Sequence, residues 1–312
     1  MIGLSSLGVA LALFAASPEP PTFSELLGQP GTKYLIVHAD DLGMCHSENA
    51  ASFKAMEAGL VTCGSVMMPC PWVLEVVEYA KTHPNVDLGI HITLNSEWKT
   101  YRWRPVAPVD KVPGLVDAQG YMWQSVEDVL KHATPAEVET ECRAQIEYAL
   151  KLGLKPTHID THMGTILAKP EFAEIYLKLG REYGLPVMLP RHVLTNGQYV
   201  TPPQASGLLE KLAAARVPVI DALAVGVEAA DFAERTAGYQ KIIRSLRPGV
   251  TQIIVHLGYE DDELKAITAG ARSRHGDFVA FTDPATRRVV QEQGIKLIGW
   301  RDLMRAGAKR SE

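Results

Sequence analysis

Long apolar runs alternate with amphipathic segments along most of the chain. The first clear run, residues 34–39, is rich in branched aliphatic side chains and ends in the adjacent carboxylates Asp40 and Asp41. A continuous apolar run of this kind is typical of a parallel strand, because helices cover both faces of such a sheet. The same pattern predicts further strands at residues 61–68, 86–94, 157–160, 186–189, 249–256 and 296–298.

The segments between these runs have the periodicity and the end signals of helices. We expect helices at residues 47–59, 72–82, 135–152, 170–183, 230–246 and 284–293. At least six strand–helix units follow one another, which indicates an α/β fold with mostly parallel strands. That number suits a closed or nearly closed barrel better than an open sheet, so we expect a TIM-barrel-like (β/α) barrel over residues 31–306, followed by a short tail at 307–312.

The pattern breaks between residues 96 and 124, where aromatic residues and prolines replace the regular alternation. A long irregular loop in a compact domain is usually functional. Two interpretations of its aromatic residues remain open: they form platforms for sugar rings, or they fill a small core beneath the loop. The candidates for substrate contact are Trp98, Tyr101, Trp103 and, later in the chain, Tyr259.

The first 17 residues are apolar and end in small residues, which predicts a signal peptide although no positive charge precedes the apolar stretch. The stretch is too short for a stable membrane span. Residues 18–30 begin with Pro18, Pro20 and Pro21 and are expected to be a linker. We therefore expect export to the periplasm or the medium; with a misplaced start codon the protein would be cytoplasmic.

Composition narrows the range of partners. The net charge of −5 and the pI of about 6.1 argue against general nucleic-acid binding, which usually requires a basic excess. Four cysteines do not make a disulfide framework in a chain of 312 residues. We expect buried free thiols; in an exported protein Cys63 and Cys70 could pair instead.

Polar residues gather where the predicted strands end. Besides Asp40 and Asp41, they are His91, the stretch 158–162 and His256. The carboxyl ends of parallel strands share one rim, where α/β barrels place their chemistry. One aspartate and two histidines form a mixed site for zinc or another divalent ion. The alternatives are a helix cap for the aspartates and ordinary hydrogen-bonded roles for the histidines.

These motifs resemble those of a known family. Residues 38–43 (HADDLG), 89–94 (GIHITL) and 156–162 (PTHIDTH), together with His256, are similar in order and spacing to the YdjC-like carbohydrate deacetylases, also called the chitooligosaccharide deacetylase family. The resemblance extends from about residue 33 to about residue 303. It implies an irregular (β/α) barrel and metal-dependent hydrolysis of an N-acetyl group on short amino-sugar oligomers.

The resemblance also implies roles for individual residues. Asp41, His91 and His162 would hold the divalent metal ion, either zinc or magnesium. Asp40 would be the general base and His256 the general acid. Three further assignments complete this hypothesis: Arg191 orients Asp40, unless it is simply an exposed arginine, and His158 and Asp160 support the ligands.

The chain departs from the family pattern at Gly164, where many members carry a further histidine, and in its longer aromatic loop. His46 and His275 receive no role. Other interpretations remain: the same machinery acting on another amide or an O-acetyl ester, a glycosidase, or a non-catalytic sugar-binding relative. The expected partner is an acetylated amino sugar or oligosaccharide, and a homodimer is compatible with the sequence.

Overall fold

The computed structural model describes residues 19–195, 197–202 and 206–308. Within these residues one sheet contains all nine strands, in the order β4-β3-β2-β1-β8-β7-β5-β6, and β9 pairs with the start of β1. The strands are β1 Lys33–Leu42, β2 Cys63–Val66, β3 Leu88–Ile92, β4 Ile159–Thr161, β5 Pro190–Thr195, β6 Gln198–Val200, β7 Ile220–Val225, β8 Gly249–Val255 and β9 Lys296–Leu297.

The sheet curls until its ends approach each other. All strand pairs are parallel except the hairpin of β5 and β6. Ile159 in β4 forms a parallel bridge with Val187, and the amides of Ile159 and Met188 donate hydrogen bonds of 2.9 Å across this junction to Pro186 and Ile159. The predicted irregular, mostly parallel (β/α) barrel is therefore confirmed.

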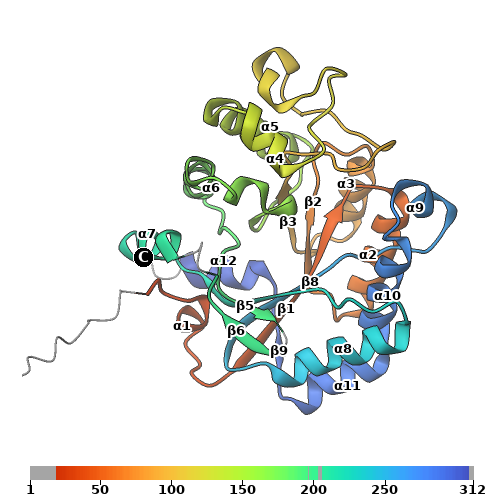
Figure 1. Cartoon of the computed structure of the whole chain (residues 1–312). Helices are drawn as coiled ribbons and strands as arrows, with labels where there is room; N and C mark the ends of the chain where they lie inside the picture. Colours follow the sequence, from red (N-terminus) through yellow and green to blue (C-terminus); the bar gives the residue numbers. More distant parts are fainter. Residues whose placement is uncertain (1–18, 196, 203–205, 309–312) are drawn as a thin grey trace, which may run out of the picture.

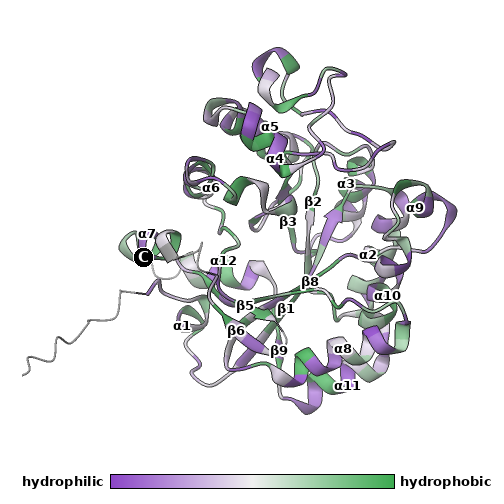
Figure 2. Ribbon diagram, viewed as in Figure 1, coloured by the Kyte–Doolittle hydropathy of each residue, from purple (hydrophilic) through white to green (hydrophobic). Residues whose placement is uncertain are grey.

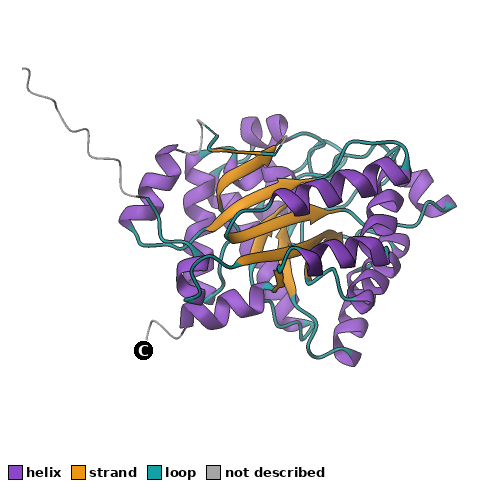
Figure 3. Ribbon diagram, turned by 90° about the horizontal axis from the view of Figure 1, so that it is seen from below, coloured by secondary structure: helices purple, strands orange, loops and turns teal. Residues whose placement is uncertain are grey.

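Helices surround the sheet on its outer side, and loops join them to the strands (Figures 1 and 3). The α-helices are α1 Phe23–Leu27, α2 His46–Ala58, α3 Val73–Thr82, α4 Val126–His132, α5 Pro135–Lys151, α6 Pro170–Tyr183, α7 Ser206–Ala214, α8 Phe232–Ser245, α9 Asp262–Ile267, α10 Ala271–Thr282, α11 Pro284–Glu292 and α12 Trp300–Ala308. The 3₁₀ turns of the described residues are η1 Val109–Lys111, η2 Pro113–Leu115 and η3 His162–Leu167.

Helix α5 shows how the sequence determines these elements. Thr134 caps its first turn in a capping box with Glu137, and Pro135 occupies the first helical position, where a missing amide hydrogen costs nothing. Its buried side chains recur with the helical period and pack into the main core; they include Val138, Cys142 and Ile146. Figure 2 shows the resulting mixture of apolar and polar residues on helices such as α5 and α8.

Several expected boundaries need correction. The segment predicted as a linker contains α1, whose residue Phe23 is buried and packs edge-to-face against Trp300 at 5.7 Å, so residues 22–28 belong to the barrel. The strand expected at 186–189 is only the bridge at Val187, and β5 begins at Pro190. Elements β6, α7 and β7, between residues 198 and 225, were not predicted; they are short, and β7 alternates buried and more exposed residues over only six positions.

The four cysteines are buried and free, as expected, and no disulfide joins Cys63 to Cys70. Among the described residues, no helix has both the length and the apolar character needed to cross a membrane. The predicted signal peptide at residues 1–17 lies outside the described residues, and so do the last residues of the tail.

Candidate active site

The end of β1 has an unusual backbone. The pairing of β1 with β2 shifts register between Ala39 and Leu42, and Asp41 adopts a left-handed conformation with φ of 65°. A non-glycine residue rarely takes this conformation, and such strain collects at functional sites. Asn49 in α2 accepts a 2.7 Å hydrogen bond from the amide of Gly43, which fixes the turn that follows.

Asp41, His91 and His162 converge at the carboxyl ends of β1, β3 and β4. Oδ1 of Asp41 lies 3.2 Å from Nε2 of His91 and 3.3 Å from Nδ1 of His162, and all three residues are buried. Within the described part of the chain, no hydrogen bond reaches this oxygen despite the short separations. Burying a carboxylate oxygen without a hydrogen bond costs folding free energy, and a cation bound at this position would offset that cost.

The second nitrogen of each imidazole is held by a carboxylate. Nδ1 of His91 lies 2.8 Å from Oδ1 of Asp160, and Nε2 of His162 lies 3.0 Å from Oε2 of Glu97. Such partners accept the N–H of one ring nitrogen and leave the lone pair of the other free for a metal. The three donors therefore fit a divalent ion. Glu97 was not predicted; its position just after β3 is the only signal in the sequence.

An arginine sets the charge of Asp41. Nη2 of Arg274, in α10, lies 2.8 Å from Oδ2 of Asp41, and its Nη1 donates to the buried Glu48. Burial by itself would raise the pKa of Asp41, but the charge of Arg274 and the two imidazoles outweigh it and hold the pKa well below its ordinary value. Burial raises the pKa of Glu48, even though Arg274 opposes this shift.

The predicted contact between Arg191 and Asp40 is wrong. Arg191 is the second residue of β5, at the amino end of that strand, whereas the site lies at the carboxyl ends. Its guanidinium pairs with Glu19 at 2.9 Å and donates to the carbonyl of Pro20. It therefore anchors the chain before α1, and Arg274 is the arginine of the site.

Asp40 and His256 face each other across the site. Oδ1 of Asp40 lies 2.7 Å from Nδ1 of His38, and its Oδ2 lies 4.0 Å from Nε2 of His256. Nε2 of His256 is also 3.9 Å from Oδ2 of Asp41. The side chain of His256 is 38% exposed, so it can reach a ligand, and its amide donates a 3.2 Å hydrogen bond to Asp277.

A pocket of about 870 Å³ opens beside His256. Glu97, Trp98, Arg274 and Asp277 contribute to its wall, together with residues of β7, α8 and α10. The pocket is large enough for a small sugar, and it brings the half-buried Trp98 beside the catalytic candidates.

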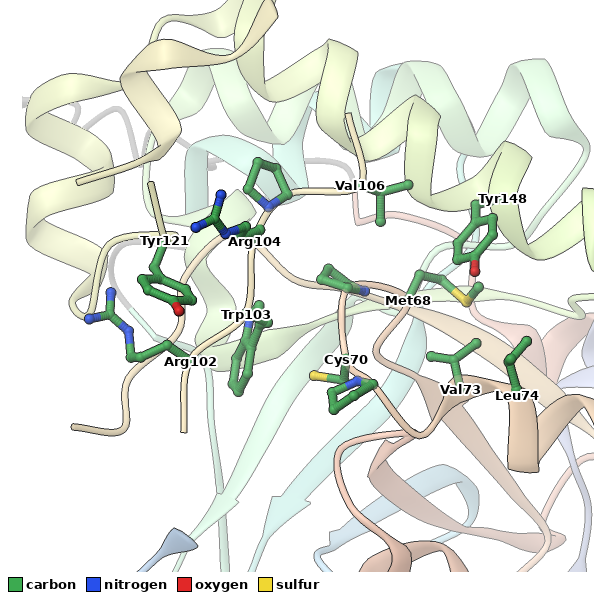
Figure 4. A pocket seen from close by; sticks show the side chains of 13 residues that line it. Met68, Cys70, Val73, Leu74, Arg102, Trp103, Arg104, Val106, Tyr121 and Tyr148 are labelled. Atoms are coloured by element: carbon green, nitrogen blue, oxygen red, sulfur yellow. The ribbon is translucent and has the colours of Figure 1, made fainter. Parts of the chain in front are cut away.

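The other aromatic candidates lie differently. Trp103 is only 3% exposed and donates from Nε1 to the carbonyl of Asn95, and Tyr101 donates to the carbonyl of Met44. Both belong to a small core under the loop, and Trp103 lines a separate pocket of about 630 Å³ (Figure 4). Tyr259 packs edge-to-face against Phe278. Among the four candidates, only Trp98 lines the pocket beside His256.

The fold and the site together define a (β/α)-barrel protein with a buried aspartate–histidine centre at the carboxyl ends of its strands. The family model described as "YdjC-like protein" matches residues 34–292, which include every candidate ligand. The chain belongs to the YdjC-like family.

The relatives match different shares of the chain. A carbohydrate deacetylase from Thermus thermophilus is 34% identical over 90% of this chain and 98% of its own length. A chitooligosaccharide deacetylase from Yersinia enterocolitica is 29% identical over 51% of this chain and 60% of its own. The solved structure of an Enterococcus faecalis protein assigned to cellobiose-phosphate cleavage superposes with a TM-score of 0.74, at 25% identity, over 87% of this chain and 99% of that one.

Proposed function

We propose that the protein is a metal-dependent carbohydrate deacetylase that hydrolyses the N-acetyl group of amino sugars and releases acetate. The names of the full-length relatives support the reaction. The observation that carries the proposal is the buried Oδ1 of Asp41, which lies within 3.3 Å of two imidazoles and accepts no hydrogen bond. Three metal-type donors that converge on one buried point fit a divalent cation.

Asp41, His91 and His162 would hold the ion. When bound there, a divalent cation supplies Lewis acidity, which polarises an acyl oxygen and makes water more acidic. Two imidazoles and one carboxylate are a donor set that suits zinc, and they also accommodate magnesium less well, because that ion prefers oxygen ligands.

Asp40 is the base of the reaction. Its Oδ1 is occupied by His38, which leaves Oδ2 free on the side that faces His256. Oδ2 accepts a proton from water as the water oxygen bonds to the carbonyl carbon of the acetamide. Arg274 binds Asp41 and not Asp40, so the two adjacent carboxylates have different partners and different duties.

His256 completes the reaction. The carbon–nitrogen bond breaks as Nε2 of His256 gives a proton to the departing nitrogen, so the products are acetate and a free amine. The hydrogen bond from its amide to Asp277 fixes the backbone of this residue. Trp98, on the pocket wall, offers an indole face against which the apolar face of a sugar ring can pack.

The test is acetate release from a panel of N-acetylated and O-acetylated sugars, with and without a chelator. We expect release from N-acetyl sugars that stops with the chelator and returns with added zinc. Asp40→Asn should lower kcat by about 10²- to 10⁴-fold with unchanged metal content. His83→Gln, which changes an exposed histidine outside the site, is the matched control. Acetate release that resists the chelator, or full activity in Asp40→Asn, would overturn the proposal.

A further inference from the structure

A buried chain of four hydrogen bonds runs from Asp40 through the barrel interior. Nδ1 of His38 lies 2.7 Å from Oδ1 of Asp40, and Nε2 of His38 lies 2.8 Å from Nε2 of His158. Nδ1 of His158 lies 3.0 Å from Oγ1 of Thr157, whose hydroxyl reaches Asp87. All five residues are buried. Asp87 precedes β3, so this series of hydrogen bonds ends at the opposite end of the barrel from the catalytic rim.

The protons in this chain can be counted. Each of the four hydrogen bonds needs one proton between its two heavy atoms. Two ionised carboxylates supply none, whereas two neutral imidazoles and one hydroxyl supply three. The chain between Asp40 and Asp87 therefore holds one proton more than its neutral groups provide. One of the two histidines is an imidazolium when both carboxylates are ionised.

Burial raises the pKa of Asp87, although Thr157 and the amide of Arg301 donate hydrogen bonds to it, so Asp87 competes for this extra proton. The surroundings favour His38. Two carboxylates face its ring: Asp40, from its own strand, and Asp160 in β4, with Oδ2 3.5 Å from Nε2. Burial lowers the pKa of His38, but these carboxylates outweigh burial and the repulsion from His91, so the pKa is raised. The pKa of His158 is well below its ordinary value, because burial and the charge of His38 both lower it. His158 accepts at Nε2 and donates at Nδ1.

The barrel makes room for this chain. A Cβ atom at Gly89 would lie 2.4 Å from Cε1 of His158, and one at Gly299 would lie 2.2 Å from Oδ2 of Asp87. The indole of Trp300 stacks on the ring of His158, with 4.9 Å between centroids and 15° between planes. A larger residue at either glycine would displace a member of the chain. The packing therefore holds His158 in one orientation.

A second metal ion does not explain the cluster. His38, His158 and Asp160 also lie close enough to be considered as a ligand set. However, two nitrogens bound to one tetrahedral zinc at about 2.0–2.1 Å would be roughly 3.3 Å apart. The 2.8 Å between the Nε2 atoms of His38 and His158 is a hydrogen-bond distance, which requires a proton between them.

We propose that His38, as an imidazolium, is the positioning residue of Asp40, and that His158, Thr157 and Asp87 hold it in that form. His38 thus orients Asp40, which is the role that the sequence suggested for Arg191. A charged donor on Oδ1 holds the carboxylate of Asp40 and turns its Oδ2 toward the substrate side. The effect on catalysis rests on the proposed deacetylase function, whereas the protonation of His38 does not.

The first experiment therefore needs no substrate. Protein labelled with ¹⁵N at histidine is studied by NMR at pH 7, and the His38 signals are assigned by their absence from His38→Asn. We expect both ring nitrogens of His38 to carry a proton and His158 to carry one, at Nδ1. A neutral His38 with a single N–H at this pH would overturn the proposal, whatever the enzyme hydrolyses.

The second experiment interrupts this series of hydrogen bonds at Thr157, far from the substrate. Thr157→Val keeps the side-chain shape but removes the hydroxyl, and Thr157→Ser restores it. With metal content unchanged, we expect Thr157→Val to lose the second N–H of His38 and to lower kcat about tenfold, with KM within about twofold. Thr157→Ser should recover both properties. Wild-type kcat and an unchanged His38 signal in Thr157→Val would contradict the proposal.

A third pair of variants covers the case in which Thr157→Val folds poorly. An asparagine at position 38 presents a neutral donor near Nδ1, whereas a glutamine presents one near Nε2. His38→Asn should therefore keep more of kcat than His38→Gln, because only the former still donates to Asp40; the reverse order would refute the role of His38. If the wild-type protein releases no acetate from any sugar, the proposed function fails and the NMR result still decides the charge of His38.

Discussion

Arg274 and Asp41 are 233 positions apart in the chain, yet Nη2 of the arginine lies 2.8 Å from Oδ2 of the aspartate. The same guanidinium donates to Glu48, which is fully buried. Two carboxylates and one cation thus form a cluster behind the candidate metal centre. Asp41 keeps a low pKa in this cluster, so its charge is available to a bound cation on its open side.

Arg274→Met should therefore weaken both the fold and the metal site. Removing one partner from a buried ionic cluster leaves uncompensated charge and costs about 3–5 kcal/mol. Urea unfolding and zinc titration measure the two effects. Arg272→Met is the matched control: Arg272 is exposed and pairs with Glu260 at 3.4 Å, so its loss should cost less than about 1 kcal/mol. An Arg274→Met protein as stable as this control would contradict the prediction.

The double variant Arg274→Met, Glu48→Gln separates stability from metal binding. Neutralising Glu48 removes one of the two stranded carboxylates, so part of the lost stability should return. Zinc affinity should stay low, because Asp41 has still lost the cation that holds its orientation and its low pKa. Recovery of both properties would mean that Glu48, and not Asp41, is the group that depends on Arg274.

Metal binding should release protons. Burial lowers the pKa of His162, but the nearby carboxylates of Asp41 and Glu97 outweigh burial and raise the pKa to about 9. His91 is raised in the same way, chiefly by the charge of Asp160. Both rings therefore hold protons more tightly than free imidazoles do, so a cation that binds them competes with protons.

Zinc affinity should therefore rise as the pH rises toward 9, and zinc binding at pH 7 should release protons. Calorimetry in buffers of different ionisation enthalpy counts these protons. Glu97→Gln removes one carboxylate that stabilises protonated His162, so this variant should release fewer. Zinc binding with no proton release would contradict the raised pKa values of His91 and His162.

The two tryptophans of the aromatic loop should respond differently to truncation. Trp98 lines the pocket beside His256, whereas Trp103 is 3% exposed and lies in the small core. Trp98→Ala should raise KM for the amino sugar several-fold, and it should lower the free energy of unfolding less than Trp103→Ala does. Trp103→Ala should cost about 3–5 kcal/mol in unfolding free energy. Steady-state kinetics and urea unfolding of the matched pair separate a substrate contact from a packing residue.

The sequence placed the strand ends well, because a parallel strand is recognisable from its apolar run and its last residues follow directly. That is how Asp41, His91 and His162 could be expected near one another. Arg274 could not be found in this way, because it lies in α10, a helix whose amphipathic pattern is weak. Arg191 was chosen from an apparent strand end, but β5 starts there instead.

His38 could have been predicted. Residues two apart in a strand share a face, so the strand geometry predicts that His38 and Asp40 lie side by side. The contact of His38 with His158 was harder to predict from the sequence, because it depends on the curl of the sheet and on the absence of a side chain at Gly89. Pairing across a barrel needs the register between strands, which a single sequence does not contain.

Glu141, in α5, links that helix to the aromatic loop. Its carboxylate accepts hydrogen bonds of 2.9 and 2.8 Å from the amides of Val106 and Ala107, and another from Gln145. Burial outweighs these hydrogen bonds and raises the pKa of Glu141 from 4.5 to about 7. The folded protein therefore binds a proton between these pH values that the unfolded chain releases.

The raised pKa of Glu141 makes the stability of the folded protein depend on pH. Because the folded pKa of Glu141 lies above the unfolded value, this group costs stability as the pH rises from 4.5 to about 7, and the cost is constant above that range. The loss amounts to about 3 kcal/mol. Glu141→Gln is neutral at every pH and should lack this component, so urea unfolding at pH 5 and pH 8 should show a smaller decrease than in the wild type. Glu78→Gln, at an exposed position of α3, should keep the wild-type decrease. Equal decreases in wild type and Glu141→Gln would mean that Glu141 is already ionised at pH 5 and that its hydrogen bonds outweigh its burial.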